Sequence, residues 1–174
     1  MEIFYPITED EPEDHATYLS VNTVVGDDLD PILYMAFQIL EYVLLDAPGT
    51  VLKKELISAG LARISWEAMK WYFTAIFFCH CENADGSQKE AFLKTVKGTL
   101  KKLADDGINQ KSLMAGINYY EFRSREADFG NAPKGLMYGL QCLDSWLYGG
   151  DPLMHLEYEE TFAFLKKGSK RRIF

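Results

Sequence analysis

The residues best suited to chemistry are the adjacent Cys79, His80 and Cys81. Thiolate and imidazole groups bind zinc, but a zinc site needs about four ligands, usually in pairs separated by two or more residues. On a strand, Cys79 and Cys81 would face one side of the sheet and His80 the other, which keeps the three from converging on one ion. The sequence has no second Cys/His pair. The pattern therefore favours an ordinary apolar strand end, with zinc binding as the alternative.

A second candidate is the pair His155 and Glu159, which would share one face of a helix because they are four residues apart. Such a pair could hold a transition metal together with ligands from elsewhere. The neighbouring Glu157 and Glu160 favour a solvated surface pair instead. His15 lies at the end of an acidic segment, where we expect a solvated side chain; a ligand role is the alternative.

Sequence motifs of common active sites are missing. The chain has no His-x-x-Glu-His, no G-x-S-x-G, no P-loop and no G-x-G-x-x-G. Glu121, Arg123, Arg125 and Glu126 lie on one predicted helix, where Glu121 and Arg125 can pair at i,i+4. A structural ion pair is favoured there over a catalytic one. We therefore predict no catalytic, cofactor-binding or metal-binding residue in this chain.

The composition predicts one folded domain. The chain has 174 residues, of which 48% are apolar and 14% aromatic, and its formal net charge is -8. This acidity argues against binding nucleic acid or an anionic membrane, since both require a basic surface. The basic run 166–172 is expected to be a solvated tail, with a nucleic-acid or membrane contact as the alternative.

The expected compartment is the cytoplasm. Three cysteines, Cys79, Cys81 and Cys142, do not form a disulfide framework and fit reduced thiols. An acidic segment follows Met1, rather than the basic and apolar pattern of a signal peptide. We see no uninterrupted apolar run near the roughly 18 residues of a membrane span.

Apolar periodicity and capping signals predict the elements. Alternation predicts a strand over 17–25, and Asp30 with Pro31 predicts a helix over 32–45 that ends at Pro48-Gly49. Segment 62–70 fits either a helical turn or a strand entry. A capping box of Ser87 and Glu90 would follow a loop over 82–86. The other predicted elements are helices over 51–59, 88–106 and 152–167, and a strand over 71–81.

The stretch from Gly107 to Asp151 carries two more helical patterns, joined by a break over 129–133. The first begins behind an Asn109 cap. The second presents an apolar surface too wide for a solvent-facing helix, so we expect the rest of the chain to cover it. The two apolar sets are Leu113, Ile117, Tyr120 and Ala127 in the first, and Leu136, Leu140, Leu143 and Leu147 in the second.

The fold class predicted from this order is α+β, with a small, mostly antiparallel or mixed sheet and helices packed on one face. We expect a leader or linker over 1–16, a single domain over 17–167 and a basic tail over 168–174.

Four segments together resemble one protein family. They read T-Y-L-S-V-N-T-V-V-G-D at 17–27, L-L-D-A-P-G-T-V-L-K-K-E-L-I-S-A-G-L at 44–61, G-I-N-Y-Y-E-F-R-S-R-E-A-D-F-G at 116–130 and P-K-G-L-M-Y-G-L-Q-C-L-D-S-W-L-Y-G-G-D-P at 133–152. The sequence resembles the presequence-protease branch of the pitrilysin/insulinase zinc metallopeptidases, and within it the domain that follows the catalytic N-terminal domain. Segment 62–81 departs from the family pattern, which has a glycine-rich turn and a Gln-Pro pair there.

This resemblance implies a non-catalytic role. Family members have two halves of two similar domains each, which enclose a chamber for unfolded peptides. Zinc is held in the first domain, whereas the second lacks the metal motif, lines the chamber and braces the first. The resemblance therefore implies an inactive domain of a zinc metalloendopeptidase. Its partners would be the other domains of the same polypeptide and peptide substrates, with zinc in the parent protein and no cofactor in this chain.

Two other functions stay open. The chain could act alone as a peptide-binding or interaction module that adds an extended peptide to a sheet edge near 71–81. It could also be a hydrolase that uses Cys79 or Cys81. Because neighbouring domains would normally cover part of its surface, we predict that the isolated chain self-associates or shows an apolar patch.

Overall fold

The computed structural model describes residues 1–6, 8, 16–61 and 74–169 of the chain. Four features of the sequence lie outside the described residues: His15, the ambiguous segment 62–70, the start of the strand predicted over 71–81, and the end of the basic run. Residues 1–6, 8 and 16 have no regular secondary structure.

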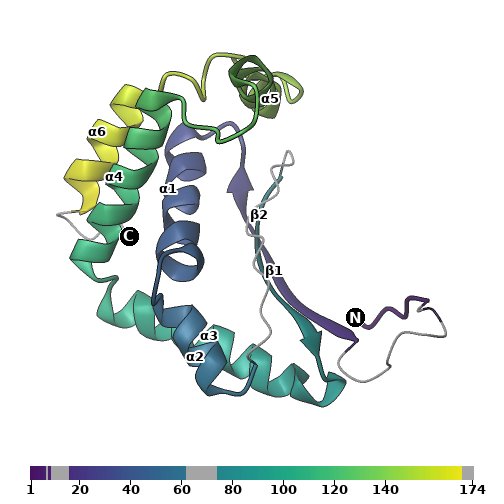
Figure 1. Cartoon of the computed structure of the whole chain (residues 1–174). Coiled ribbons are helices and arrows are strands. Elements are labelled where there is room, and N and C mark those ends of the chain that lie inside the picture. The colour runs from purple at the N-terminus through teal and green to yellow at the C-terminus, as the bar shows by residue number, and fades with distance from the viewer. Residues whose placement is uncertain (7, 9–15, 62–73, 170–174) are drawn as a thin grey trace.

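The sheet in the described part of the chain has two long antiparallel strands, β1 (Thr17–Asp27) and β2 (Thr74–Ala84). Val21 pairs with Cys79 and Leu19 with Cys81, and the register is irregular at both ends of the ribbon. The predicted strand over 17–25 is confirmed. β2 continues through Ala84, so the prediction of a loop from residue 82 is wrong there: Thr17 still pairs with Ala84. In Figure 1 the ribbon stands beside an arc of helices.

The first helical segment forms as its caps predict. Helix α1 (Pro31–Glu41) starts behind Asp30, whose side chain accepts hydrogen bonds from the backbone of Ile32 and Leu33. It continues as the π-helical turn η1 (Tyr42–Asp46). Helix α2 (Val51–Ser58) follows, and Gly49 and Gly60 adopt φ of 75° and 77° at the two chain reversals.

A short 3₁₀ turn, η2 (Gly86–Gln88), precedes helix α3 (Lys89–Asp106), which ends at Gly107 as predicted. The capping box lies two residues earlier than Ser87 and Glu90. The Asp85 carboxylate accepts from the Ser87 backbone, and Gln88 accepts from the Asp85 backbone. Asp and Ser cap helices about equally well, so residue type alone did not distinguish Asp85 from Ser87; Asp85 is the one that directly follows the end of β2.

Three helices complete the chain: α4 (Gln110–Glu126), α5 (Lys134–Trp146) and α6 (Tyr158–Ser169). The Asn109 side chain caps α4, as predicted. The predicted helix start near residue 152 is wrong. Turns occupy 152–156, where the Asp151 carboxylate accepts from the Leu153 backbone, and α6 begins only at Tyr158.

Two hydrophobic cores hold these elements together. The first packs one face of the ribbon against η1, α2 and α3, and the second joins α1, η1, α4 and α6. Because α1 and η1 form one continuous helical segment, they link the two cores. The first core includes Leu19, Leu45, Leu52, Leu56, Cys79 and Phe92. The second includes Met35, Ile39, Leu113, Ile117, Phe162 and Leu165. The predicted α+β class, with a small antiparallel sheet and helices, is confirmed.

The stretch Pro31–Ser58 is long and apolar enough, by length and composition, to cross a membrane. In this fold the helical path is interrupted at Ala47, which has ψ of 147°. Ile39 before the break and Leu52 after it are both fully buried, each in a different core. Core packing therefore accounts for the apolar character of this stretch.

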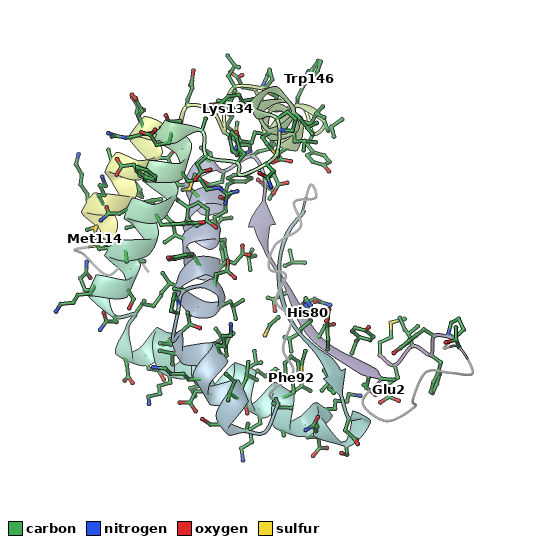
Figure 2. All side chains as sticks on the ribbon, in the orientation of Figure 1. Glu2, His80, Phe92, Met114, Lys134 and Trp146 are labelled. Atoms are coloured by element: carbon green, nitrogen blue, oxygen red, sulfur yellow. The ribbon has the colours of Figure 1, made fainter. Side chains whose placement is uncertain are left out.

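Helix α5 differs most from the sequence prediction. Its only buried residue is Ser145, whereas Trp146 and Leu147 are 63% and 68% exposed. Figure 2 shows Lys134 and Trp146 on this helix, which lies apart from the two cores. We expected the rest of the chain to cover the second apolar set, and this is wrong for the described residues. The exposed apolar side chains of α5 and its C-terminal end are Leu136, Tyr138, Leu140, Leu143, Trp146 and Leu147.

Candidate functional site

A cleft lies between α1, α4 and α5, and residues of the turn before α6 also line it. Its volume is about 700 Å³, which is enough for a small organic molecule or a long side chain. The lining combines aromatic rings with carboxylates. The residues that line it are Tyr34, Met35, Gln38, Glu41, Asp46, Tyr120, Arg123, Ser124, Phe129, Met137, Tyr138, Leu140, Gln141, Asp144, His155, Leu156 and Tyr158.

One wall of this cleft is a group of three polar residues from three different elements. The Tyr34 hydroxyl donates a hydrogen bond of 2.9 Å to Oδ2 of Asp144, which ties α1 to α5. The His155 ring stacks on the Tyr34 ring at a centroid distance of 3.9 Å. Only 7% of the His155 surface is exposed, and neither ring nitrogen makes a hydrogen bond of normal geometry.

The environment of this wall favours neutral groups. Burial lowers the pKa of His155, and the Asp28 backbone only partly opposes this effect. Burial also raises the pKa of Asp144, against the opposite influence of the Tyr34 hydroxyl. At neutral pH the imidazole is therefore uncharged, with one nitrogen able to accept a hydrogen bond and the other able to donate one.

Asp28 lies behind this wall, in the turn between β1 and α1. It is inaccessible to solvent, and neither carboxylate oxygen has a hydrogen-bond partner. Burial, followed by the charges of Asp144 and Asp27, raises the pKa of Asp28 to about 7. A buried, unpartnered carboxylate is costly for a fold to keep, so this position is a source of pH dependence.

The charges of the cleft are predominantly negative. Glu41, Asp46 and Asp144 line it, and Arg123 is the single Lys or Arg among the lining residues. The Arg123 Nε donates to the backbone oxygen of Asp128, which holds this guanidinium at the side formed by the loop after α4. Burial raises the pKa of Asp46 as well as that of Asp144.

The strand residues Cys79, His80 and Cys81 do not line this cleft. Both thiols are buried in the first core, and His80 pairs across the ribbon with Ser20 and lies 3.6 Å from a Glu82 oxygen. Burial raises the pKa of Cys79 to about 12 and also raises that of Cys81. A reactive thiol needs the opposite shift, which argues against a nucleophilic cysteine here.

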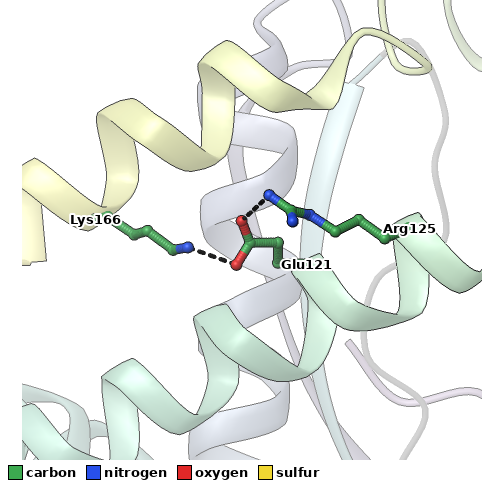
Figure 3. A network of polar contacts seen from close by, with 3 residues as sticks. All are labelled: Glu121, Arg125 and Lys166. Atoms are coloured by element: carbon green, nitrogen blue, oxygen red, sulfur yellow. Dashed lines mark hydrogen bonds and ion pairs between the residues drawn. The ribbon is translucent and has the colours of Figure 1, made fainter.

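The predicted ion pair on α4 is confirmed. Arg125 Nη2 lies 3.0 Å from Oε1 of Glu121, and the second oxygen of the same carboxylate contacts Nζ of Lys166 on α6 (Figure 3). The Glu126 backbone oxygen accepts a hydrogen bond from Lys134 at the start of α5. The Glu121–Lys166 pair connects α4 to α6, and the Glu126–Lys134 bond connects α4 to α5, so the role of these two contacts is structural.

The predicted surface pair of His155 and Glu159 is wrong. His155 lies in the turn before α6 and is buried against Tyr34, whereas Glu159 is exposed on α6. The sequence pattern suggested one helix because Pro152 follows a turn, but the helix starts six residues later. Sequence reasoning also missed Asp28, Tyr34 and Asp144. The only signal for them was the presence of polar residues within or beside apolar helical patterns.

A metal centre does not fit the described residues. No three His, Cys, Asp or Glu side chains in that part of the chain gather closely enough to hold a metal ion. This includes the wall of the cleft, although it contains one imidazole and one carboxylate. No step of a metal-dependent reaction is assigned to this chain.

Comparison with solved structures identifies the fold. The inactive peptidase domain of a candidate zinc protease from Bordetella parapertussis superposes with a TM-score of 0.67 at 13% identity, covering 88% of this chain and 82% of that one. A candidate zinc protease from Bordetella pertussis superposes with a TM-score of 0.60, also at 13% identity, over 90% of this chain and 80% of that one. The chain therefore shares the fold of these two protease structures.

Comparison of sequences finds two long relatives, one of which is named as a protease. Protein HypA of Clostridium perfringens is 39% identical over 171 residues, which make up 98% of this chain and 18% of that protein. Presequence protease 1 of Arabidopsis thaliana, a chloroplast and mitochondrial protein, is 29% identical over 165 residues, or 93% of this chain and 15% of that protein. No family model matches. The chain is thus a distant homologue of a presequence protease and spans less than a fifth of the length of either relative.

Proposed function

We propose that this chain is a non-catalytic domain of a zinc-dependent peptidase that degrades peptides in the cytoplasm. In that role it lines the chamber that receives the peptide and braces the catalytic domain, which holds the zinc. Its partners are the other domains of the same polypeptide and the peptide substrates.

One observation carries the proposal: a peptidase-domain fold occurs here without a metal-binding cluster in the described part of the chain. The fold alone would fit an active or an inactive domain, since fold does not determine chemistry. Residues 16–61 and 74–169 contain no cluster of metal-binding side chains, which supports the inactive alternative.

The surface of α5 supports a bracing role. Trp146, Leu147 and Leu136 are each more than half exposed, and an apolar patch of this kind on a folded domain generally marks a contact with another protein surface. Both relatives are more than five times longer than the matched segment, so in them most of the polypeptide lies outside the part that this chain resembles.

The test compares the chain alone with the same chain inside a polypeptide that also contains the His-x-x-Glu-His domain. We expect the chain alone to bind no stoichiometric zinc by elemental analysis and to leave an unstructured fluorogenic peptide uncut. The longer polypeptide should bind one zinc and cleave the peptide. Zinc binding and turnover by the chain alone would refute the proposal.

A second candidate is a stand-alone module that binds an extended peptide. Among the described residues β1 pairs with β2 alone, and Tyr18 and Val24 on β1 are exposed. Such a strand offers its other edge to a peptide by strand addition. The length of the encoded polypeptide distinguishes the two candidates, because a reading frame without a zinc domain would leave only the binding module.

A further inference from the structure

We propose that the cleft between α1, α4 and α5 binds an organic cation, a guanidinium or ammonium group, against Asp144 and His155. The cation can belong to a free small molecule or to a side chain of a peptide. This inference rests on the geometry of the cleft and does not require the proposed function.

The net charge of the cleft selects the sign of the ligand. Three carboxylates, Glu41, Asp46 and Asp144, face it from α1, η1 and α5, against the guanidinium of Arg123 on α4. With His155 neutral, the lining carries a formal charge of -2 when all three acids are ionised. Burial raises the pKa of Asp46 and of Asp144, and a cation bound beside them would oppose this effect by favouring their charged forms. An anionic ligand would be repelled there, whereas a cation would restore the balance.

The wall of the cleft offers hydrogen-bond acceptors with capacity for further bonds. Oδ2 of Asp144 already accepts from Tyr34, but a carboxylate can accept several bonds through its two oxygens. His155 is almost completely buried, and neither ring nitrogen makes a hydrogen bond of normal geometry, although the Asp28 backbone acts on the ring. Buried polar groups are nearly always satisfied, so the imidazole has unused capacity for a hydrogen bond. One N–H of the cation donates to Asp144, and a second reaches the accepting nitrogen of His155 when the stack of the His155 ring on Tyr34 opens, because that nitrogen has almost no exposed surface.

Aromatic rings provide the second attraction for a cation. Tyr34, Tyr120, Phe129 and Tyr138 line the cleft, and Phe129 and Tyr138 pack edge to face with centroids 5.4 Å apart. The face of an aromatic ring attracts a guanidinium or ammonium group, and the effect grows as water is excluded. A planar guanidinium suits this combination best, because it stacks on rings and donates two parallel hydrogen bonds.

A metal ion is a poorer occupant of the same space. The described residues hold no cluster of three metal-binding side chains, and aromatic rings cannot replace the missing ligands. The volume of about 700 Å³ also suits an organic group better than a bare ion.

Binding is measured by isothermal titration of the full 174-residue chain with four probes. Agmatine supplies a free guanidinium, and the blocked peptide Ac-Gly-Arg-Gly-NH2 supplies a side chain. The same peptide with citrulline in place of arginine is a neutral isostere, and inorganic phosphate is the anionic control. We expect dissociation constants on the order of 1 mM for the arginine probes, as small ligands with few contacting atoms allow.

Two variants test the named residues. Asp144→Asn keeps an acceptor for Tyr34 but removes the charge, and His155→Phe keeps a ring that can stack on Tyr34 but removes both nitrogens. Each should weaken binding of the cation roughly tenfold or more, since hydrogen bonds to charged groups are the strong ones. Asp105→Asn, an exposed acid on α3 outside the cleft, is the matched control and should bind as the parent chain does. Circular dichroism checks that each variant is folded.

The outcomes separate the sources of the cation. Binding of both arginine probes, lost in Asp144→Asn, supports a site for free cations, and binding of the peptide alone supports a site for a peptide side chain. Equal binding of the citrulline peptide, equal affinity in Asp144→Asn, or no saturable binding by either arginine probe would overturn the proposal. None of these results depends on zinc or peptidase activity, so this proposal and the proposed function can fail separately.

Discussion

The Asp28→Asn variant should be more stable than the parent chain at high pH and should lose part of the parent's pH dependence. Asp28 is fully buried without a hydrogen-bond partner, and its pKa is raised from the ordinary 3.8 to about 7. The folded chain therefore keeps the proton up to about pH 7, whereas the unfolded chain releases it near pH 4. Between those values folding requires proton uptake, so the free energy of unfolding falls as pH rises.

The size of the effect follows from the two pKa values. The difference is about three pH units, each worth about 1.4 kcal/mol, which gives a loss of about 4 kcal/mol between pH 4 and pH 7. The carboxyl group is covered but lies in a turn near the surface, where water responds to its charge, so we expect about 2–4 kcal/mol. Asp144 accepts the Tyr34 hydroxyl and thus holds its own charge more readily, so we assign the retained proton of this neighbouring pair to Asp28.

The assay is urea unfolding followed by far-ultraviolet circular dichroism, for both proteins, from pH 4 to pH 8. At pH 4 the two free energies of unfolding should nearly agree, because asparagine is close in shape and charge to a protonated aspartic acid. At pH 8 the variant should be more stable by the amount above. Glu159→Gln, an exposed acid on α6, is the control and should follow the parent at every pH. Parallel curves for the parent and Asp28→Asn would refute the reasoning.

Three further predictions concern packing, thiols and association. Gly116→Ala should be less stable than Gly139→Ala by about 1–3 kcal/mol in urea unfolding. A Cβ at Gly116 would lie 2.8 Å from Cγ2 of Val43, whereas a Cβ at Gly139 meets open space. Equal stabilities of the two variants would contradict this close packing. In the folded chain, mass spectrometry should detect alkylation of the partly exposed Cys142 before that of Cys79 and Cys81. Burial and raised pKa values suppress the thiolate form of Cys79 and Cys81. Rapid labelling of Cys79 would contradict this prediction. The isolated chain should self-associate in sedimentation velocity, and Trp146→Glu should reduce this without lowering the melting temperature; a parent chain that stays monomeric at all concentrations would exclude it.

Much of the fold could be predicted from local sequence signals. The Asp30 and Pro31 helix start, the glycines that end α2 and α3, and the Asn109 cap all act over a few residues, so the sequence around each decides the outcome. The start of α6 could not be predicted in the same way. Asp151 and Pro152 look like a helix start, but there Asp151 caps a turn.

The candidate site could not be predicted because tertiary packing creates it. Tyr34 lies more than a hundred residues before Asp144 and His155 in the chain, and only the tertiary contacts of α1 with α5 and with the turn before α6 bring the three together. In the sequence, Tyr34 and Asp144 are single polar groups within apolar helical patterns. His155 has the spacing of a surface helix pair, and this misleading pattern concealed a buried side chain.

Helix α5 shows what an apolar pattern does and does not specify. Leucines at Leu136, Leu140, Leu143 and Leu147 predict a surface that must be covered, and that inference depends only on the unfavourable exposure of apolar area to water. The pattern does not say which polypeptide segment provides the cover. Here the helix is held at its edges by polar contacts, Tyr34 with Asp144 and Ser145 with the Asp151 backbone, while its apolar side remains open. A helix fastened through polar groups and left apolar outward is arranged for a second surface, which is why α5 is the element through which we expect this domain to contact its neighbours.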